Sequence, residues 1–238
     1  MVSKIRVLGG TPLRGEVTVR GAKNLVPKAM VAALLSAEQS KLRNVPLIRD
    51  VDVVSDLLRM HGATVDYDQE AGVLGITPGS INLPEDPVEM DTLAGSSRIP
   101  ILFAGPLLHN LGEAFIPDLG GCHIGSRPVN FHLRVLEDFG ARRIQEAAGM
   151  HLIAEKPLKA KPVHLPYPSV GATEQTLLTA VMAQGITELT NAAVEPEIMD
   201  LIAILQKMGA IISVDTDRTI RIEGVDKLRG YSHTALPD

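Results

Sequence analysis

The stretch Lys207-Met208-Gly209-Ala210-Ile211-Ile212-Ser213-Val214 joins the end of a predicted helix to a predicted strand through a single glycine. The same arrangement occurs twice earlier in the chain, as Met60-His61-Gly62-Ala63-Thr64-Val65-Asp66-Tyr67 and as Asp138-Phe139-Gly140-Ala141. A glycine directly after an apolar helical stretch favours the left-handed conformation that ends helices, and alternating residues after it are typical of a strand with one buried face. Three copies of this junction indicate an internal repeat.

Each copy also opens alike, with small residues and a polar group ahead of an apolar helix. The openings are Gly21-Ala22-Lys23-Asn24, Gly95-Ser96-Ser97-Arg98 and Gly171-Ala172-Thr173-Glu174. The repeats then cover about residues 20–90, 91–165 and 166–226, and units of roughly 75 residues are too small to bury their apolar faces alone. A glycine after a helix is common enough to recur by chance, but three matches with the same flanking helices favour a true repeat.

The repeat predicts an α/β domain with pseudo-threefold symmetry. Its most apolar helices are expected at residues 25–35, 99–108 and 174–183. Because these helices carry few polar residues, they belong in the interior, and the alternating strands belong outside them.

Composition narrows the class of protein. The 238 residues carry a net charge of −5, with 3% aromatic residues, no tryptophan and one cysteine. This charge and the few aromatic residues argue against a nucleic-acid surface, and no apolar run is long enough for a transmembrane helix. The first residues, 1–7, alternate like a strand and lack the apolar core of a signal peptide. We therefore expect a cytoplasmic protein with no nucleic-acid or membrane partner, and the single cysteine fits a reducing compartment.

The openings of the repeats predict an anion site. Helix N-termini carry unpaired N–H groups and a partial positive charge, and the pseudo-symmetry would bring three of them together. Lys23 and Arg98 stand at two of the openings, and the third follows Ser169-Val170-Gly171-Ala172-Thr173, a run suited to phosphate oxygens. Taken singly, Lys23 or Arg98 could be an ordinary solvent-exposed surface residue, because most lysines and arginines are. Their recurrence at equivalent positions favours a binding role.

The densest group of chemically useful residues is Asp118-Leu119-Gly120-Gly121-Cys122-His123-Ile124-Gly125-Ser126-Arg127-Pro128-Val129. The glycines place Cys122 on a loop, where Arg127 would lower the pKa of the thiol. A lone cysteine is also commonly an inert core residue, so both interpretations stay open. His123 would point away from Cys122 in an extended loop, and His132 is expected to pack locally on a helix. No metal-ligand spacing and no dinucleotide or phosphate-loop fingerprint occurs, so no metal or cofactor is predicted.

These residues together resemble the UDP-N-acetylglucosamine 1-carboxyvinyltransferases, the enolpyruvyl transferases of the EPSP synthase-like superfamily. The resemblance spans essentially the whole chain and is most specific in the cysteine loop and the Lys23-Asn24 pair. The matching stretches are Leu8-Gly9-Gly10-Thr11-Pro12-Leu13-Arg14-Gly15-Glu16-Val17, Gly21-Ala22-Lys23-Asn24, Arg98 with Gly105-Pro106-Leu107, the 120–128 loop, Ser169-Val170-Gly171-Ala172-Thr173, Asn191-Ala192-Ala193 and Glu195-Pro196-Glu197.

The resemblance implies an inside-out α/β barrel, built from three βαβαββ units with helices inside and sheets outside. It also implies roles for individual residues. Cys122 would act as a general acid or form a reversible adduct with phosphoenolpyruvate, whose phosphate and carboxylate Lys23, Arg98 and Arg127 would hold. Asn24 would bind the sugar. The uridine diphosphate part would contact Arg127, Pro128, Val129, Asn130 and Phe131, together with Ser169, Val170 and Gly171.

Two departures from the family pattern are local, and one concerns length. Some members carry Asp where this chain has Asn130 and Lys where it has Tyr167, which would weaken nucleotide contacts without changing the chemistry. Family members are about twice as long, with the active site between two domains. The resemblance assigns residues 20–230 to the N-terminal domain, and residues 1–19 and 231–238 to a second domain that supplies the catalytic base and further arginines.

The implied reaction adds the 3-hydroxyl of UDP-N-acetylglucosamine to phosphoenolpyruvate and releases phosphate, the first committed step of peptidoglycan synthesis. It needs cations for an anionic substrate, an acid and a base. This chain offers the first two, so we expect weak binding and little turnover from it alone. Three alternatives stay open: a non-catalytic UDP-sugar-binding half, the related enzyme acting on shikimate 3-phosphate, and an unrelated thiol enzyme with a histidine held against Cys122.

Overall fold

The computed structural model describes residues 4–84, 87–94, 97–117, 129–147 and 149–238. The first repeat contains a helix followed by a strand, a second helix and two more strands. In chain order these are α1 (Val26–Ala32), the 3-10 helix η1 (Ala33–Leu35), β1 (Ser40–Arg43), α2 (Arg49–Met60), β2 (Thr64–Asp68) and β3 (Val73–Thr77).

The second and third repeats follow the same order after one additional element each, the helix α3 in the second and the strand β7 in the third. The second contains α3 (Pro87–Ala94), the 3-10 helix η2 (Ile99–Phe103), α4 (Ala104–Leu111), β4 (Glu113–Pro117), α5 (Asn130–Asp138), β5 (Arg142–Glu146) and β6 (Gly149–Ile153). The third contains β7 (Val163–His164), α6 (Val170–Ala180), β8 (Ile186–Thr190), α7 (Pro196–Met208), β9 (Ile211–Val214) and β10 (Ile220–Glu223), and β11 (Ser232–Thr234) follows it.

The strands form three sheets whose orders correspond. They run β11-β1-β3-β2, β4-β6-β5 and β7-β8-β10-β9. In both four-stranded sheets one parallel pair, β11 with β1 or β7 with β8, is continued by antiparallel strands. The internal repeat is thus visible in the sheet topology.

β11 is part of the first sheet. The family resemblance assigns residues 231–238 to a second domain, and in this structure Ser232–Thr234 pairs in parallel with β1, where Leu42 faces His233. In this chain β11 takes the position beside β1 that β7 takes beside β8. The C-terminal residues therefore complete the first sheet.

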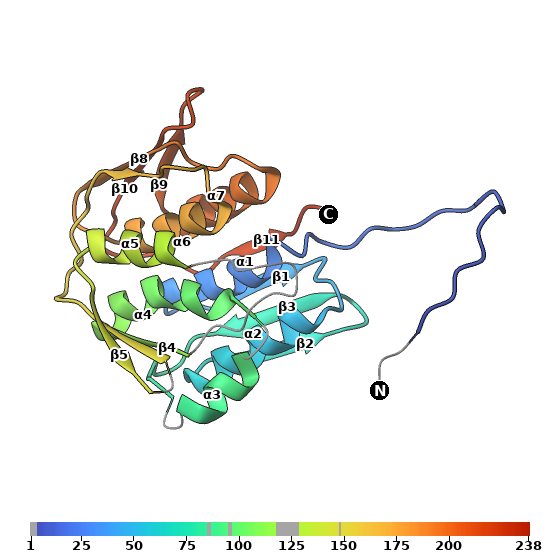
Figure 1. Cartoon of the computed structure of the whole chain (residues 1–238), viewed down its shortest axis with the longest axis horizontal. Coiled ribbons are helices and arrows are strands. Elements are labelled where there is room, and N and C mark those ends of the chain that lie inside the picture. Colours follow the sequence, from blue (N-terminus) through green and yellow to red (C-terminus); the bar gives the residue numbers. More distant parts are fainter. Residues whose placement is uncertain (1–3, 85–86, 95–96, 118–128, 148) are drawn as a thin grey trace.

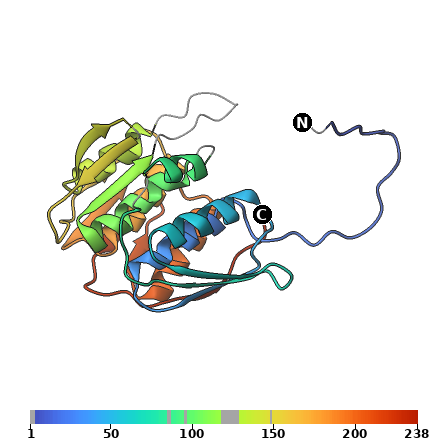
Figure 2. The ribbon, with the colours of Figure 1, turned by 90° about the horizontal axis from the view of Figure 1, so that it is seen from below.

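The most apolar helices, α1 and α6, lie in the interior, as the sequence predicted, and the sheets lie toward the outside of them (Figure 1). Every residue of α1 is buried, as are the residues of α6 from Ala172 to Ala180. Figure 2 shows the same layering from below. The α/β class is confirmed, whereas the three sheets of the described residues do not join into a closed barrel.

The glycines that end three of the helices have the left-handed conformation that the sequence predicted. Gly62, Gly140 and Gly209 all have positive φ, at 90°, 97° and 106°. This left-handed conformation lets the chain leave a helix and enter the next strand, and L-residues with a Cβ adopt it at a cost. α7 also begins with Pro196 in its first turn, where the missing N–H has no helical partner to lose.

The N-terminal segment, residues 4–20, contains no strand and runs away from the folded body (Figure 1). Its apolar side chains are exposed, and Ile5 and Leu13 have exposed fractions of 89% and 97%. The alternation of residues 1–7 predicted a strand there, but a strand needs a neighbouring strand to bond with, and none of the described strands pairs with residues 4–20. At the end of the segment the Arg20 carbonyl accepts a hydrogen bond from the Asp238 N–H at 3.2 Å. No helix among the described residues is both long and apolar enough to cross a bilayer.

Candidate functional site

A pocket of about 460 Å³ lies where the three repeats meet, and we call it the junction pocket. Its walls come from the start of α1, the residues around η2, α5, the start of α6 and the start of α7. The lining residues are Asn24, Lys28, Arg98, Ile99, Ile101, Leu102, His132, Tyr167, Pro168, Ser169, Val170, Gly171, Glu174, Glu195 and Glu197.

The N-terminus of α6 forms one wall of the junction pocket. Ser169 is the N-cap, with extended backbone and a side-chain oxygen that accepts a hydrogen bond from the Ala172 N–H at 3.3 Å. The hydroxyl of Thr173 donates to the Ser169 carbonyl at 2.9 Å. These bonds fix the first turn of the helix, whose N–H groups and partial positive charge suit an anion.

Two buried charges meet beside this wall. Lys28 of α1 and Glu174 of α6 form an ion pair of 3.5 Å between Nζ and Oε1, with side-chain exposures of 11% and 4%. Burial raises the pKa of Glu174 from 4.5 to about 7, and the charge of Lys28 opposes that rise. An isolated buried charge is costly, so each residue depends on the other.

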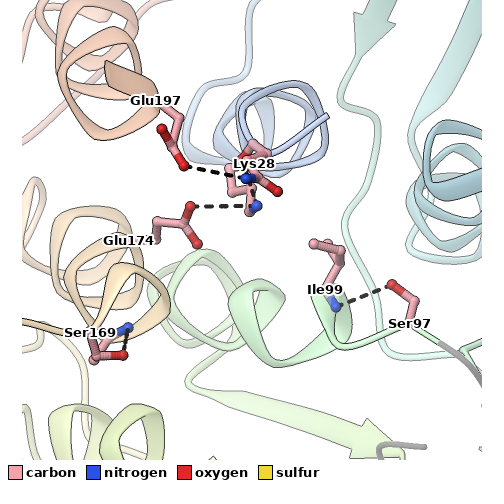
Figure 3. Close-up of polar contacts among 8 residues, drawn as sticks. Lys28, Ser97, Ile99, Ser169, Glu174 and Glu197 are labelled. Atoms are coloured by element: carbon pink, nitrogen blue, oxygen red, sulfur yellow. Dashed lines mark hydrogen bonds and ion pairs between the residues drawn. The ribbon is translucent and has the colours of Figure 1, made fainter. Parts of the chain in front are cut away.

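The same cluster holds Asn24, beside Lys28, Glu174 and Glu197, which Figure 3 labels. Lys28 Nζ donates to the backbone carbonyl of Asn24, and the Asn24 side-chain amide donates to Glu197 Oε1 at 3.3 Å. α1, α6 and α7 therefore meet through one polar network at the edge of the pocket.

His132 and Arg98 face the junction pocket from the second repeat. Burial lowers the pKa of His132 to about 4, and the positive charge of Arg98 adds to this effect. His132 is thus neutral at neutral pH. Its ring lies against Gly171, where any Cβ would overlap Nε2 and Cε1 of the ring. Ser97 fixes the start of η2 by accepting a hydrogen bond from the Ile99 N–H at 3.3 Å.

The structure brings together five of the residues that the sequence singled out. Asn24, Arg98, Ser169, Val170 and Gly171 all line the junction pocket. They come from all three repeats, as the pseudo-symmetry predicted.

Other predicted residues lie elsewhere. Lys23 does not line the pocket; its Nζ pairs with Asp50 at 3.2 Å on the surface. Val129 and Phe131 are half-buried at the start of α5, and Asn130 beside them is exposed. Cys122, Arg127 and Pro128 lie outside the described residues, so the cysteine loop stays a prediction.

Sequence reasoning missed Lys28 and Glu174. Both stand in helices whose apolar character predicted a plain core. A lysine and a glutamate inside such helices are a usable signal, because fully buried charges are rare unless they are paired. Among the described residues, no cluster of His, Cys, Asp and Glu could hold a metal ion.

A larger cavity of about 720 Å³ lies away from these residues. Its lining includes Arg142, Lys156, Lys159 and Lys161 but none of the residues predicted for the site. The junction pocket, not this larger cavity, therefore contains residues that the sequence predicted for the site.

The chain is similar in sequence to a known protein family and to curated proteins. Residues 7–238 match the family of EPSP synthase (3-phosphoshikimate 1-carboxyvinyltransferase). The chain is 43% identical over 239 residues to the UDP-N-acetylglucosamine 1-carboxyvinyltransferase of Protochlamydia amoebophila, covering 98% of this chain and 51% of that protein. It is 44% identical to the protein of that name from Acidiphilium cryptum, covering 100% of this chain and 56% of the relative.

A solved structure is similar in fold. The enolpyruvyl transferase NikO from Streptomyces tendae superposes with a TM-score of 0.83 at 22% identity, over 97% of this chain and 53% of NikO. The chain spans about half the length of the curated relatives it matches. With a family match over nearly all of its residues, the chain belongs to the EPSP synthase family of enolpyruvyl transferases.

Proposed function

We propose that this chain contributes the sugar-nucleotide and phosphoenolpyruvate site of a UDP-N-acetylglucosamine 1-carboxyvinyltransferase, a cytoplasmic enzyme of peptidoglycan synthesis. The observation that carries the proposal is the junction pocket, which joins Asn24, Arg98 and the N-cap of α6. The names of relatives at 43–44% identity point to the same substrate.

The pocket chemistry suits an anionic sugar nucleotide. The N-terminus of α6, with Ser169, Val170 and Gly171, offers a hydroxyl and helix N–H groups to the diphosphate. Asn24 offers an amide to the sugar. The contacts to the uridine part are proposed for Pro128, Val129, Asn130 and Phe131. Arg98, with Lys23 and Arg127, would balance the charge of phosphoenolpyruvate.

The proposed reaction proceeds by addition and elimination. The sugar 3-hydroxyl loses its proton to a base and its oxygen bonds to C2 of phosphoenolpyruvate, while C3 gains a proton. C3 then loses a proton, the C2–C3 double bond re-forms, and the bond from C2 to the phosphate oxygen breaks. Cys122 is the proposed acid at C3 or the nucleophile of a reversible adduct. Because the relatives are about twice as long, we propose that their other domain supplies the base and closes the site.

Phosphate release from phosphoenolpyruvate and UDP-N-acetylglucosamine tests the proposal. The 238-residue chain alone should release little or none, and adding the remaining domain of a relative in trans should produce release. Cys122→Ala should abolish that release, whereas Lys159→Met, in the larger cavity, should leave it unchanged. Release with shikimate 3-phosphate but not with UDP-N-acetylglucosamine would contradict the proposed substrate.

A further inference from the structure

Asn24 is held at both its backbone and its side chain. Its carbonyl accepts a hydrogen bond from Lys28 Nζ, one helical turn later in the chain. Its side-chain Nδ2 donates to Glu197 Oε1 at 3.3 Å. Since the amide oxygen sits on the same carbon as Nδ2, this bond also sets where the Asn24 acceptor lies.

Lys28 in turn depends on Glu174. The Nζ–Oε1 distance is 3.5 Å and both side chains are nearly removed from water. A lysine has three donors but a long flexible stem, so a single bond to a carbonyl would not fix its position. The second attachment of Lys28 is to Glu174 on α6 (Figure 3). It ties Asn24, through Lys28, to the same helix whose N-terminus forms the proposed diphosphate wall.

We infer that Lys28 and Glu174 are positioning residues for Asn24, and that they set the share of affinity contributed by the sugar of the nucleotide. The inference rests on the proposed function. Neither residue needs to touch the ligand. The pair acts by holding the amide of Asn24 at a fixed position relative to the N-terminus of α6, the proposed diphosphate wall.

The charge state of Glu174 supports this role. Its pKa is raised to about 7 by burial, with Lys28 lowering it and Glu197 raising it further. The other charged or titratable groups lining the pocket are Arg98, His132, Tyr167 and Glu195. The pKa of His132, at about 4, keeps this side chain neutral near pH 7. Below the pKa of Glu174 the ion pair with Lys28 loses its negative partner, so sugar affinity should weaken as the pH falls through about 7.

Calorimetric titration of the 238-residue chain with UDP-N-acetylglucosamine and with UDP separates positioning from general structure. The ratio of the two dissociation constants gives the sugar preference. In Lys28→Met and Glu174→Gln this preference should fall about tenfold, which corresponds to about 1.4 kcal/mol, while UDP affinity stays at the wild-type value. Lys28→Arg should restore much of the preference, and the control Lys159→Met should not change it.

Two further measurements keep the inference testable if a single variant folds poorly. The double variant Lys28→Met/Glu174→Gln leaves no unpaired charge, and replacing a buried ion pair in this way is often tolerated; it should remain folded and still lose the sugar preference. In addition, UDP-N-acetylglucosamine affinity should weaken between about pH 8 and about pH 6 in wild type but stay level in Glu174→Gln.

The outcomes distinguish this inference from the function on which it rests. Equal loss of UDP and UDP-N-acetylglucosamine affinity, or an unchanged sugar preference in the double variant, would overturn the positioning role alone. Wild-type chain that binds neither nucleotide would overturn the proposed function, and the positioning role with it.

Discussion

At Gly171 the backbone of α6 lies against a pocket side chain, the ring of His132. A methyl group at this position would overlap the ring of His132. Gly171→Ala should therefore push the ring into the junction pocket and weaken UDP binding about tenfold, as expected when a pocket loses shape. Calorimetry of Gly171→Ala beside Gly171→Ala/His132→Ala checks the cause, because the second change removes the ring. Wild-type affinity in the single variant would contradict the close packing.

A second prediction at the residue scale concerns Glu174 and the way in which the free energy of unfolding changes with pH. Its pKa is raised from 4.5 to about 7 in the folded chain, so the folded state binds the proton more tightly than the unfolded state. The stabilisation from this site is full below pH 4.5 and is lost as the pH rises to about 7. Glu174→Gln cannot ionise, so its free energy of unfolding should decline less over this range.

Urea denaturation at about pH 5 and about pH 8 measures that decline. Glu188→Gln is the matched control, since Glu188 is exposed on β8 and its loss should leave the wild-type decline in place. An identical decline in wild type and Glu174→Gln would show that Glu174 titrates as an ordinary surface carboxylate.

At the scale of elements, the N-terminus of α6 combines a structural and a binding role in Ser169. The side chain caps the helix, and Ser169 is one of the residues that line the junction pocket. Ser169→Ala should cost about 1 kcal/mol of stability, whereas Ser169→Gly should cost only a few tenths. Both changes remove the hydroxyl, so both should weaken UDP binding to the same extent.

Thermal unfolding and calorimetry on this pair of variants separate the two roles. If UDP affinity instead followed stability, falling in Ser169→Ala but not in Ser169→Gly, the hydroxyl would have no direct part in binding.

At the scale of elements, part of the fold and part of the candidate site could be predicted from the sequence. Local sequence signals were enough where the conformation depends on one residue, and the predicted left-handed glycines at 62, 140 and 209 are confirmed. The three apolar helices are innermost as predicted. Asn24, Arg98 and the residues of α6 were brought to one pocket because the repeat itself carries the pseudo-symmetry.

The rest depends on contacts between distant residues. The sequence predicted Lys28 and Glu174 only as parts of apolar helices. Hydrophobic periodicity predicts a helix, but it does not show which charged residues will form an ion pair. Lys23 seemed equivalent to Arg98, yet the nearby carboxylate of Asp50 holds it on the surface. The three residues of β11 joined the first sheet because the position beside β1 offers unpaired hydrogen-bonding groups.

At the scale of the whole molecule, β11 closes the fold by tying the end of the chain to its first sheet. The Tyr231 hydroxyl just before it donates to the Ala29 carbonyl at 2.7 Å inside α1. His233 of β11 contacts Asp200 and Lys207 of α7, at 2.9 Å and 2.8 Å. The C-terminal strand thus contacts the first and third repeats together.

Tyr231→Phe tests this closure. Tyr231 is buried, so losing its hydrogen bond should lower the free energy of unfolding by about 1 kcal/mol. Urea denaturation measures the loss, and Tyr167→Phe is the control because Tyr167 is 64% exposed. Equal stability of the two variants would mean that the bond to α1 contributes nothing to the fold.

The central claim is that the junction pocket binds a UDP-sugar, and calorimetric titration of the chain with UDP-N-acetylglucosamine against shikimate 3-phosphate tests it most directly. We predict saturable binding of UDP-N-acetylglucosamine that weakens at least about tenfold in Asn24→Ala, stays unchanged in Lys159→Met, and is not displaced by shikimate 3-phosphate. Binding of shikimate 3-phosphate in place of the sugar nucleotide, or sugar-nucleotide binding untouched by Asn24→Ala, would contradict it.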